Sequence, residues 1–140
     1  MPVTAGIVVR GDSVLVVQRK PDSRRGLLWE FPGGKIEPGE DPRQCLRREF
    51  QEELGIEVEA GERFEIVYHH YTDMRILLLS YLCHLVQGEP KALDCHSFRW
   101  VTREELRDLA MTAADTPLRD AICAGKSGLR PPVLVPSCQP

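Results

Sequence analysis

The sequence contains no apolar run long enough to cross a membrane as a helix. Its most hydrophobic stretch, residues 76–83, is interrupted by Ser80, whereas a membrane-spanning helix needs about 18 or more apolar residues. That stretch is instead predicted to form a buried strand. The N-terminus has no charged segment followed by an apolar one, as a secretory signal would have. We therefore expect a cytoplasmic protein that does not associate with membranes.

Cysteine and lysine are both scarce. The five cysteines are odd in number and form no C-x-x-C pair, which favours reduced thiols over a disulfide framework. Only 4 of the 18 cationic side chains are lysine, and the net charge is −3. This balance argues against a protein that coats nucleic acid, so no direct nucleic-acid binding is expected. The planar guanidinium group suits phosphate, although codon bias in a GC-rich genome would explain the arginine excess equally well.

The length and composition fit one globular domain. The chain has 140 residues, of which 42% are hydrophobic and 28% charged, and this is enough to build a core without disulfides or metals. We place the domain at residues 1–125. Residues 126–140 carry 4 of the 11 prolines, which predicts an extended or disordered tail.

Hydrophobic patterning predicts strands alternating with helices. Strands are expected at residues 3–9, 14–18, 27–31, 56–58, 64–68, 75–86 and 98–101. A helix is expected at residues 42–54, because Asp41 is a capping residue, Pro42 suits the first turn and Gly55 suits a left-handed end. Two further helices are expected at residues 102–109, which start with a capping-box pattern, and at residues 116–124.

Three glutamates share one edge of the predicted central helix. Glu49, Glu52 and Glu53 stand at positions i, i+3 and i+4, which places them on an arc of about a quarter of the helix circumference. Carboxylates clustered in this way repel one another, and a hard cation such as Mg²⁺ or Mn²⁺ would compensate. Taken alone, such a run is more often a solvated acidic face.

The residues before this helix complete a longer pattern. Gly33 and Gly34 allow the backbone to approach a ligand closely. From Gly34 to Ile56 the chain spells G-x5-E-x7-R-E-F-x-E-E-L-G-I. This pattern resembles the signature of the Nudix hydrolases at every required position. Residues 14–19, 30–35 and 100–101 resemble the MutT-like branch, so the similarity covers residues 3–125. The resemblance implies an α/β Nudix fold, which is an α/β/α sandwich with a mixed, curved sheet.

The resemblance also implies a metal site. Glu52 and Glu53 would be direct ligands of Mg²⁺, for which Mn²⁺ could substitute, and the carbonyl group of Gly33 would complete the site. Glu49 would contact a metal or activate the attacking water. Arg48 would pair with one of these carboxylates and hold it in place.

Asp94 stands where relatives often have a further metal-binding glutamate, six residues before Trp100. Its side chain is shorter by one methylene group than that of glutamate. Direct ligation and a water-bridged contact to the metal are therefore both open.

The resemblance to the MutT-like branch implies further residues that would bind the substrate. Arg19 would contact phosphates, and Gly34 and Lys35 are also assigned to the substrate. Asp115 would read the edge of a base, and it is also a candidate N-cap of the last helix, since the two roles are compatible. An ionised aspartate only accepts hydrogen bonds, which suits an amino group on cytosine or guanine. A protonated one could also donate, which requires a pKa raised by an apolar pocket.

Two arginines in the loop before residue 27 could close over the substrate. They are Arg24 and Arg25, and ordinary surface charge is the favoured interpretation of both.

The most concrete expectation is a Mg²⁺-dependent nucleoside triphosphate pyrophosphohydrolase. It would release the monophosphate and pyrophosphate from 8-oxo-dGTP, which would sanitise the nucleotide pool, or from a CTP-type nucleotide. ADP-ribose, nucleotide sugars and dinucleotide polyphosphates are alternative substrates, and a nucleotide-sensing protein without turnover is an alternative function. We expect a monomer or a homodimer.

Overall fold

The computed structural model describes residues 1–125, and it contains six strands and three helices in that range. Their bounds, in chain order, are β1 Pro2–Arg10, β2 Ser13–Gln18, β3 Trp29–Glu30, α1 Pro42–Leu54, β4 Glu57–His70, β5 Arg75–Gln87, β6 Ser97–Thr102, α2 Arg103–Arg107 and α3 Thr116–Ala124. The predicted tail at residues 126–140 lies outside the described residues.

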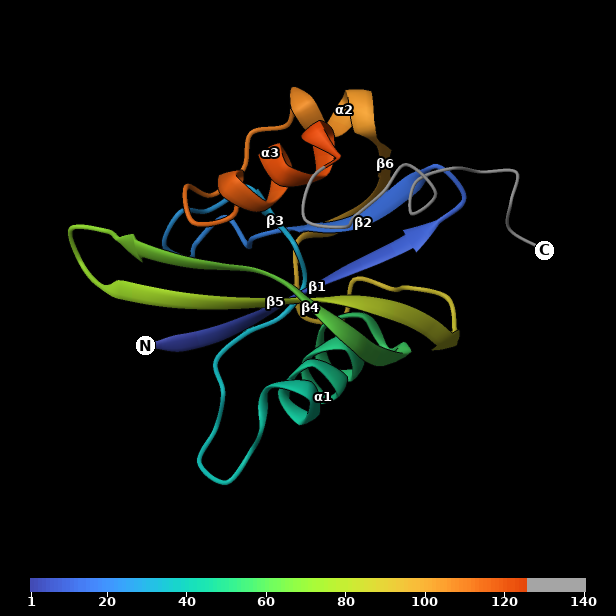
Figure 1. Cartoon of the computed structure of the whole chain (residues 1–140), viewed down its shortest axis with the longest axis horizontal. Helices are drawn as coiled ribbons and strands as arrows, with labels where there is room; N and C mark the ends of the chain where they lie inside the picture. Colours follow the sequence, from blue (N-terminus) through green and yellow to red (C-terminus); the bar gives the residue numbers. More distant parts are fainter. Residues whose placement is uncertain (126–140) are drawn as a thin grey trace.

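The strands form one mixed sheet. Its order is β3-β2-β1-β5-β4, and β6 pairs with β2. The pairing of β1 with β5 is parallel, whereas the other pairs are antiparallel. Helix α1 lies on one side of the sheet, and α2 and α3 lie on the other (Figure 1). The predicted α/β/α sandwich is therefore confirmed.

Strands β1 and β2 diverge beyond their connecting turn. They pair only at Val9–Val14 and Arg10–Ser13. Further along, β1 hydrogen-bonds to the glycine loop instead, because Thr4 N–H donates to the Gly34 carbonyl and Gly6 N–H donates to the Pro32 carbonyl, both at 2.8 Å. The loop is thereby fixed between the two halves of the sheet, next to the start of α1.

Each side of the sheet has its own hydrophobic core. On one side Leu46, Phe50 and Leu54 of α1 are fully buried. On the other side Leu118 and Ile122 of α3 are fully buried. The spacing of four residues in each helix explains these faces, because residues i and i+4 lie on the same side of a helix.

Both ends of α1 are formed by the residues that predicted them. Asp41 accepts a hydrogen bond from Gln44 N–H, and the Gln44 side chain accepts one from Asp41 N–H, each at 2.9 Å. Gly55 ends the helix with φ 67°, in the left-handed region that favours glycine. The helix start and end are therefore confirmed.

Several strand and helix predictions need correction. Residues 56–58 and 64–68 belong to the single long strand β4, whose register against β5 shifts around Ala60, Arg63 and Ile66. The strand predicted at residues 27–31 shortens to the two residues of β3, and the helix predicted at residues 102–109 shortens to the five of α2. Local patterns could not reveal these limits, because pairing partners elsewhere in the chain set them.

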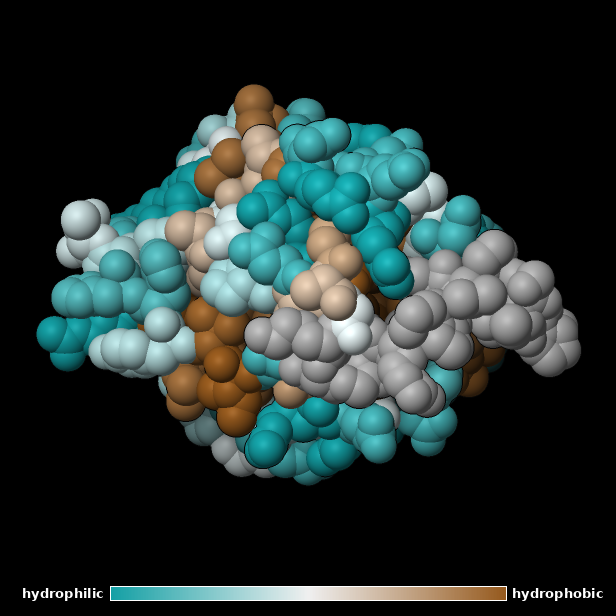
Figure 2. Space-filling model, turned by 45° about the horizontal axis from the view of Figure 1, so that its top comes forward, coloured by the Kyte–Doolittle hydropathy of each residue, from teal (hydrophilic) through white to brown (hydrophobic). Residues whose placement is uncertain are grey.

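The predicted buried strand at residues 76–83 is buried only in part. On β5, Leu78 and Cys83 are buried, whereas Leu77 is exposed, as are Ile66 and Tyr68 on the neighbouring β4. The face drawn in Figure 2 is mostly hydrophilic, with its largest group of hydrophobic residues left of the centre and smaller groups elsewhere. No helix in the described part of the chain is both long enough and apolar enough to cross a membrane.

Candidate active site

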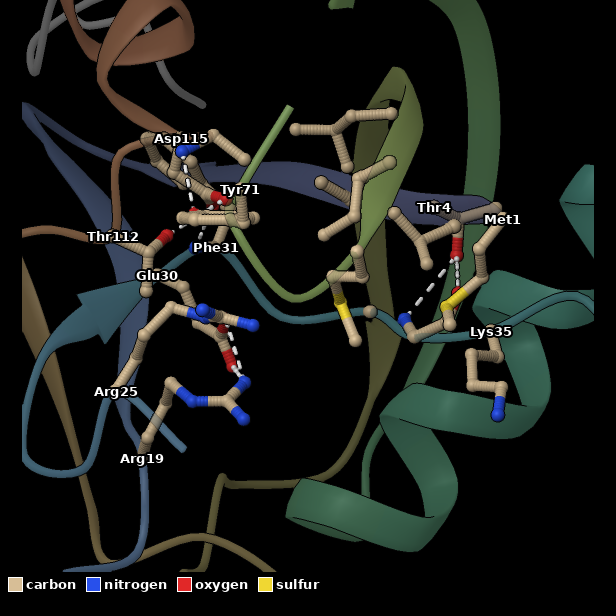
Figure 3. Close-up of a pocket in the computed structure, with 18 of the residues that line it drawn as sticks. Met1, Thr4, Arg19, Arg25, Glu30, Phe31, Lys35, Tyr71, Thr112 and Asp115 are labelled. Atoms are coloured by element: carbon tan, nitrogen blue, oxygen red, sulfur yellow. Dashed lines mark hydrogen bonds and ion pairs between the residues drawn. The ribbon is translucent and has the colours of Figure 1, made fainter. Parts of the chain in front are cut away.

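A cavity of about 320 Å³ opens beside the glycine loop. Its walls come from the start of β1, the end of β2, β3, the turn between β4 and β5, and the segment before α3. Arg19 and Arg25 lie on one side of the cavity, with Asp115 and Tyr71 above them in the view, and Lys35 lies on the opposite side (Figure 3). Most of the predicted substrate-binding residues therefore surround one space.

The acidic edge of α1 contains two coupled carboxyl groups. Glu53 and Glu49 share a side-chain hydrogen bond, and burial raises the pKa of both. The pKa of Glu53 lies well above its usual range, because the negative charges of Glu30 and Glu49 add to its burial. The buried carboxyl groups of Glu49 and Glu53 thus concentrate negative charge at this edge of the helix, which favours the binding of a cation or a proton.

Glu52 lies apart from this pair. Its side chain is 56% exposed and contacts Arg48 at 3.3 Å. Within residues 1–125, no group of three His, Cys, Asp or Glu side chains is arranged so that it could hold a metal ion. The structure therefore brings together two of the three predicted glutamates and leaves the third at the surface.

Arg48 connects the glycine loop to the acidic edge. Its guanidinium group donates to Glu40 at 2.6 Å, to Glu49 at 3.0 Å and to the Lys35 carbonyl at 3.0 Å. The hydrogen bond from Arg48 lowers the pKa of Glu40 to about 2. The predicted pairing of Arg48 with a carboxylate of the motif is present, and Arg48 holds Glu40 as well.

The donor atoms at this edge fit a hard divalent cation. They are the carboxyl oxygens of Glu49 and Glu53, and Mg²⁺ and Mn²⁺ prefer oxygen ligands of this kind. The glycine backbone lies directly against Glu49, so a methyl group on Gly34 would come within 2.5 Å of the Glu49 carboxyl. A cation here would offset the burial and the negative charges of Glu30 and Glu49 that raise the pKa of Glu53.

Glu30 is a candidate site residue that the sequence reasoning missed. Both of its carboxylate oxygens accept hydrogen bonds from Arg19, at 3.1 and 3.2 Å. Burial raises the pKa of Glu30, and Arg19 opposes that shift. An acidic residue inside an otherwise apolar strand was the available signal, since a buried carboxylate needs a partner. The Arg19 side chain that was predicted to contact phosphates is therefore positioned by Glu30.

Asp115 is buried beside the cavity. Its Oδ2 accepts a hydrogen bond from Phe31 N–H at 2.8 Å, and its Oδ1 accepts one from the Thr112 hydroxyl at 3.1 Å. Burial, reinforced by the negative charge of Glu30, raises the pKa of Asp115 to about 7. Its side chain makes no capping hydrogen bond to α3. Asp115 is thus the N-cap residue of α3 by its position, and its carbonyl group accepts from Leu118 and Arg119 N–H, but its side chain does not cap the helix.

Asp94 has a different partner from the one expected. Its carboxylate contacts Lys20 at 2.5 Å, and its side chain is 60% exposed. Its backbone contacts α1, where Asp94 N–H donates to the Glu53 carbonyl at 3.2 Å, and the negative charge of Asp94 adds to the rise in the pKa of Glu53. A metal-binding role for Asp94 stays a prediction, and it would require the carboxylate to leave Lys20.

The two loop arginines are held beside the cavity. Arg24 and Arg25 both pair with Asp73, which lies in the turn between β4 and β5. The Arg25 guanidinium stacks on the Tyr71 ring at 3.8 Å. The Tyr71 hydroxyl accepts a hydrogen bond from Ala114 N–H at 2.8 Å. These contacts favour a role for Arg25 in the cavity wall over the ordinary surface charge expected from the sequence.

Comparison with known proteins places this geometry in a family. The NUDIX domain model matches residues 1–122. The chain is 42% identical over 118 residues to "Putative 8-oxo-dGTP diphosphatase 2" of Mycobacterium tuberculosis, with 81% of each chain covered. It is 36% identical over 122 residues to "CTP pyrophosphohydrolase" of Escherichia coli, with 87% of this chain and 90% of the relative covered. The solution structure of the Escherichia coli ORF135 protein superposes with a TM-score of 0.77 at 35% identity, covering 91% of each chain.

Proposed function

The chain belongs to the NUDIX domain family as a Nudix hydrolase, and from this we propose that it is a Mg²⁺-dependent nucleoside triphosphate pyrophosphohydrolase. It hydrolyses an NTP or dNTP to the monophosphate and pyrophosphate. Mn²⁺ substitutes for Mg²⁺, since both prefer oxygen ligands. The names of the relatives support this reaction class, because they describe a diphosphatase and a pyrophosphohydrolase that act on nucleoside triphosphates.

One observation carries the proposal. The cavity has guanidinium groups of Arg19 and Arg25 on one side and the glycine loop with Lys35 on the other, while the buried carboxyls of Glu49 and Glu53 lie at the helix behind that loop. A triphosphate carries several negative charges, which need cations on both sides. Arginines supply such charge directly, and carboxylates supply it by holding a divalent cation.

The residues of the acidic edge have distinct proposed tasks. Glu49, Glu52 and Glu53 would hold Mg²⁺ together with the Gly33 carbonyl, and Asp94 would contribute directly or through water. When bound, the ion neutralises phosphate charge and favours the ionised form of a bound water. Glu49 accepts the proton of the attacking water, while Arg48 keeps the Glu49 carboxylate oriented. Glu52 reaches the site by rotating away from Arg48.

The nucleotide is positioned by the cavity walls. Arg19, oriented by Glu30, binds phosphate, and the backbone of Gly34 and the Lys35 side chain lie along the same phosphate path. Asp115 contacts the base. The two substrate candidates are 8-oxo-dGTP and a CTP-type nucleotide, which correspond to the names of the relatives. The expected cytoplasmic location and the monomeric or homodimeric state stay predictions.

Release of pyrophosphate from a nucleotide panel tests the proposal. The panel contains 8-oxo-dGTP, CTP, dCTP and ADP-ribose, each with and without Mg²⁺. We expect pyrophosphate and monophosphate from at least one triphosphate and none without a divalent cation. Turnover of ADP-ribose alone would transfer the proposal to nucleoside diphosphate derivatives, and no turnover at all would favour a nucleotide-sensing protein.

Substitution of Glu53 tests the assignment of the acidic edge. Glu53→Gln should keep the fold and lower kcat by about two orders of magnitude or more, because the amide cannot provide an anionic oxygen. Glu62→Gln, on the exposed part of β4, is the matched control and should retain full activity. Near-normal turnover by Glu53→Gln would contradict the metal assignment.

A further inference from the structure

Thr112 is a buried residue that the proposed reaction does not yet use. It is 3% exposed and lies at the cavity beside Asp115. Its backbone is fixed next to β3, because Thr112 N–H donates to the Trp29 carbonyl at 2.9 Å. Its hydroxyl lies 3.1 Å from Asp115 Oδ1. A buried hydroxyl in such a fixed place, with a carboxyl group as its partner, controls which hydrogen bonds that carboxyl can offer to a ligand.

The two partners of Asp115 differ in what they permit. Phe31 N–H is a backbone donor and can only donate to Oδ2. The Thr112 hydroxyl can rotate, so that it donates to an ionised Oδ1 or accepts from a protonated one. A proton on Asp115 is therefore best placed on Oδ1, where the Thr112 hydroxyl accepts it and it is not offered to a ligand.

We propose that Thr112 determines base specificity. Its hydroxyl group pairs with Oδ1 whether or not Asp115 carries a proton. Asp115 therefore offers a ligand in the cavity only lone pairs that accept hydrogen bonds. Each carboxylate oxygen can accept two hydrogen bonds, so one lone pair on each remains for a ligand. A pocket with only acceptors selects a base whose edge presents an exocyclic amino group over one that presents a carbonyl oxygen. This inference rests on the proposed nucleotide hydrolysis and deepens it.

The charged surroundings make this pairing necessary near neutral pH. The pKa of Asp115 is raised to about 7 by burial and by Glu30 on β3, while Arg19 at the end of β2 lowers it. Arg19 is paired with Glu30, and Arg25 is paired with Asp73. On α3, Arg119 bonds to Asp120 and the Leu109 carbonyl and so faces elsewhere. Around pH 7 both forms of Asp115 are populated, and without Thr112 the neutral form could donate into the cavity.

The decisive test compares Thr112→Val with Thr112→Ser. Valine has the shape of threonine without the hydroxyl, whereas serine keeps the hydroxyl. The measurement is kcat/KM for CTP against UTP, and for ATP against ITP, at about pH 6 and about pH 9. These pairs differ in an amino or carbonyl group on the base edge. We expect the wild type to favour the amino member at both pH values.

Thr112→Val should lose this preference only where Asp115 is neutral. We expect its amino-to-carbonyl ratio to fall by about tenfold or more at pH 6 and to stay close to the wild-type ratio at pH 9. Thr112→Ser should keep the wild-type ratio at both values. A ratio in Thr112→Val that is unchanged at pH 6, or a wild-type preference for carbonyl bases, would overturn the inference.

A second measurement separates this inference from the proposed function. The carboxyl ¹³C signal of Asp115 can be titrated without any substrate, and calorimetry can compare the binding of CMP and UMP. Thr112→Val should raise the titration midpoint of Asp115 and weaken the preference for CMP at pH 6. If the wild type hydrolyses no nucleotide, the proposed function fails, and these two measurements alone decide the role of Thr112.

Discussion

Gly34 is a position where one added carbon atom would reach the acidic edge. Its missing Cβ would lie 2.5 Å from the Glu49 carboxyl group. Because that carboxyl is the end of a side chain, it can move without disrupting the fold. We therefore expect Gly34→Ala to lower kcat/KM by roughly 10- to 100-fold while the melting temperature changes little. Steady-state kinetics with Mg²⁺ and thermal unfolding check both expectations.

Gly39 in the same loop provides the control for this substitution. Its φ is +82° and nothing lies within 4 Å of its missing Cβ, so Gly39→Ala strains the backbone without touching Glu49. It should cost about 1 kcal/mol of unfolding free energy and leave kcat/KM near the wild-type value. Equal loss of activity in the two variants would mean that loop strain, and not the displacement of Glu49, is responsible.

The candidate site could be predicted from the sequence where its residues belong to the continuous motif or, as for Arg19 and Asp115, to the wider family resemblance. Arg48 and Glu49 were assigned because they stand in the loop–helix pattern, and their contact is present. The partners Glu30 and Thr112 were not assigned. The role of Glu30 depends on its hydrogen bond with the Arg19 side chain. The role of Thr112 depends on its backbone hydrogen bond to β3, which brings residues 29 and 112 together. Such contacts follow from the tertiary fold. The acidic residue in an apolar strand was a local signal for Glu30, but it did not identify the partner of Glu30, and Thr112 had no such signal.

Among the elements, α1 was predictable because its end signals are local. Asp41 and Gln44 form a reciprocal capping box within four residues, and Gly55 ends the helix. Strand β4 was not predictable as one element, because Gly61 interrupts its apolar pattern and its continuity depends on pairing with β5. The extent of a strand is set by its neighbour in the sheet, whereas the extent of a helix is largely set by its own residues.

The cap of α1 can be tested separately from catalysis. Asp41→Ala removes the acceptor for Gln44 N–H, which should lower the unfolding free energy by about 1 kcal/mol and the melting temperature by a few degrees. Because Asp41 is exposed at the far start of the helix, kcat at low temperature should not change. Gln44→Ala, which removes only the reciprocal bond, should have a smaller effect on stability. An unchanged melting temperature in Asp41→Ala would contradict the importance of this cap.

At the scale of the whole molecule, the divergence of β1 from β2 opens a space that is shared by two functional regions, one on each side of the sheet. The α1 side of the sheet carries the acidic edge, and the segment before α3 on the other side carries Asp115. The glycine loop fills the space between them and lines the shared cavity. Four carboxyl groups near this junction have raised pKa values, largely through burial: Glu30, Glu49, Glu53 and Asp115. The pKa values of these four carboxyl groups are therefore higher in the native state than in the unfolded state.

This concentration predicts how stability depends on pH. Above about pH 5 the unfolded chain has lost these protons, whereas the native state keeps them to higher pH, with Asp115 titrating at about 7. The native state thus binds more protons in this interval, and the free energy of unfolding should fall as the pH rises from about 5 to about 8. Glu40 acts in the opposite direction, since its pKa is lowered to about 2, but only below about pH 4.5. Chemical denaturation at several pH values, without divalent cations, measures this slope.

Divalent cations should oppose this fall in the free energy of unfolding with rising pH. Mg²⁺ or Mn²⁺ binds the ionised carboxylates and competes with the protons that Glu49 and Glu53 hold, so the stabilisation it gives should increase with pH. We expect the rise in melting temperature on adding Mn²⁺ to be larger at about pH 8 than at about pH 5.5. Glu53→Gln should show a weaker cation effect and a flatter pH dependence, because it removes one buried carboxyl. If Mn²⁺ does not change the melting temperature at either pH, the acidic edge of α1 binds no metal. The pyrophosphohydrolase assignment would then lose its chemical basis.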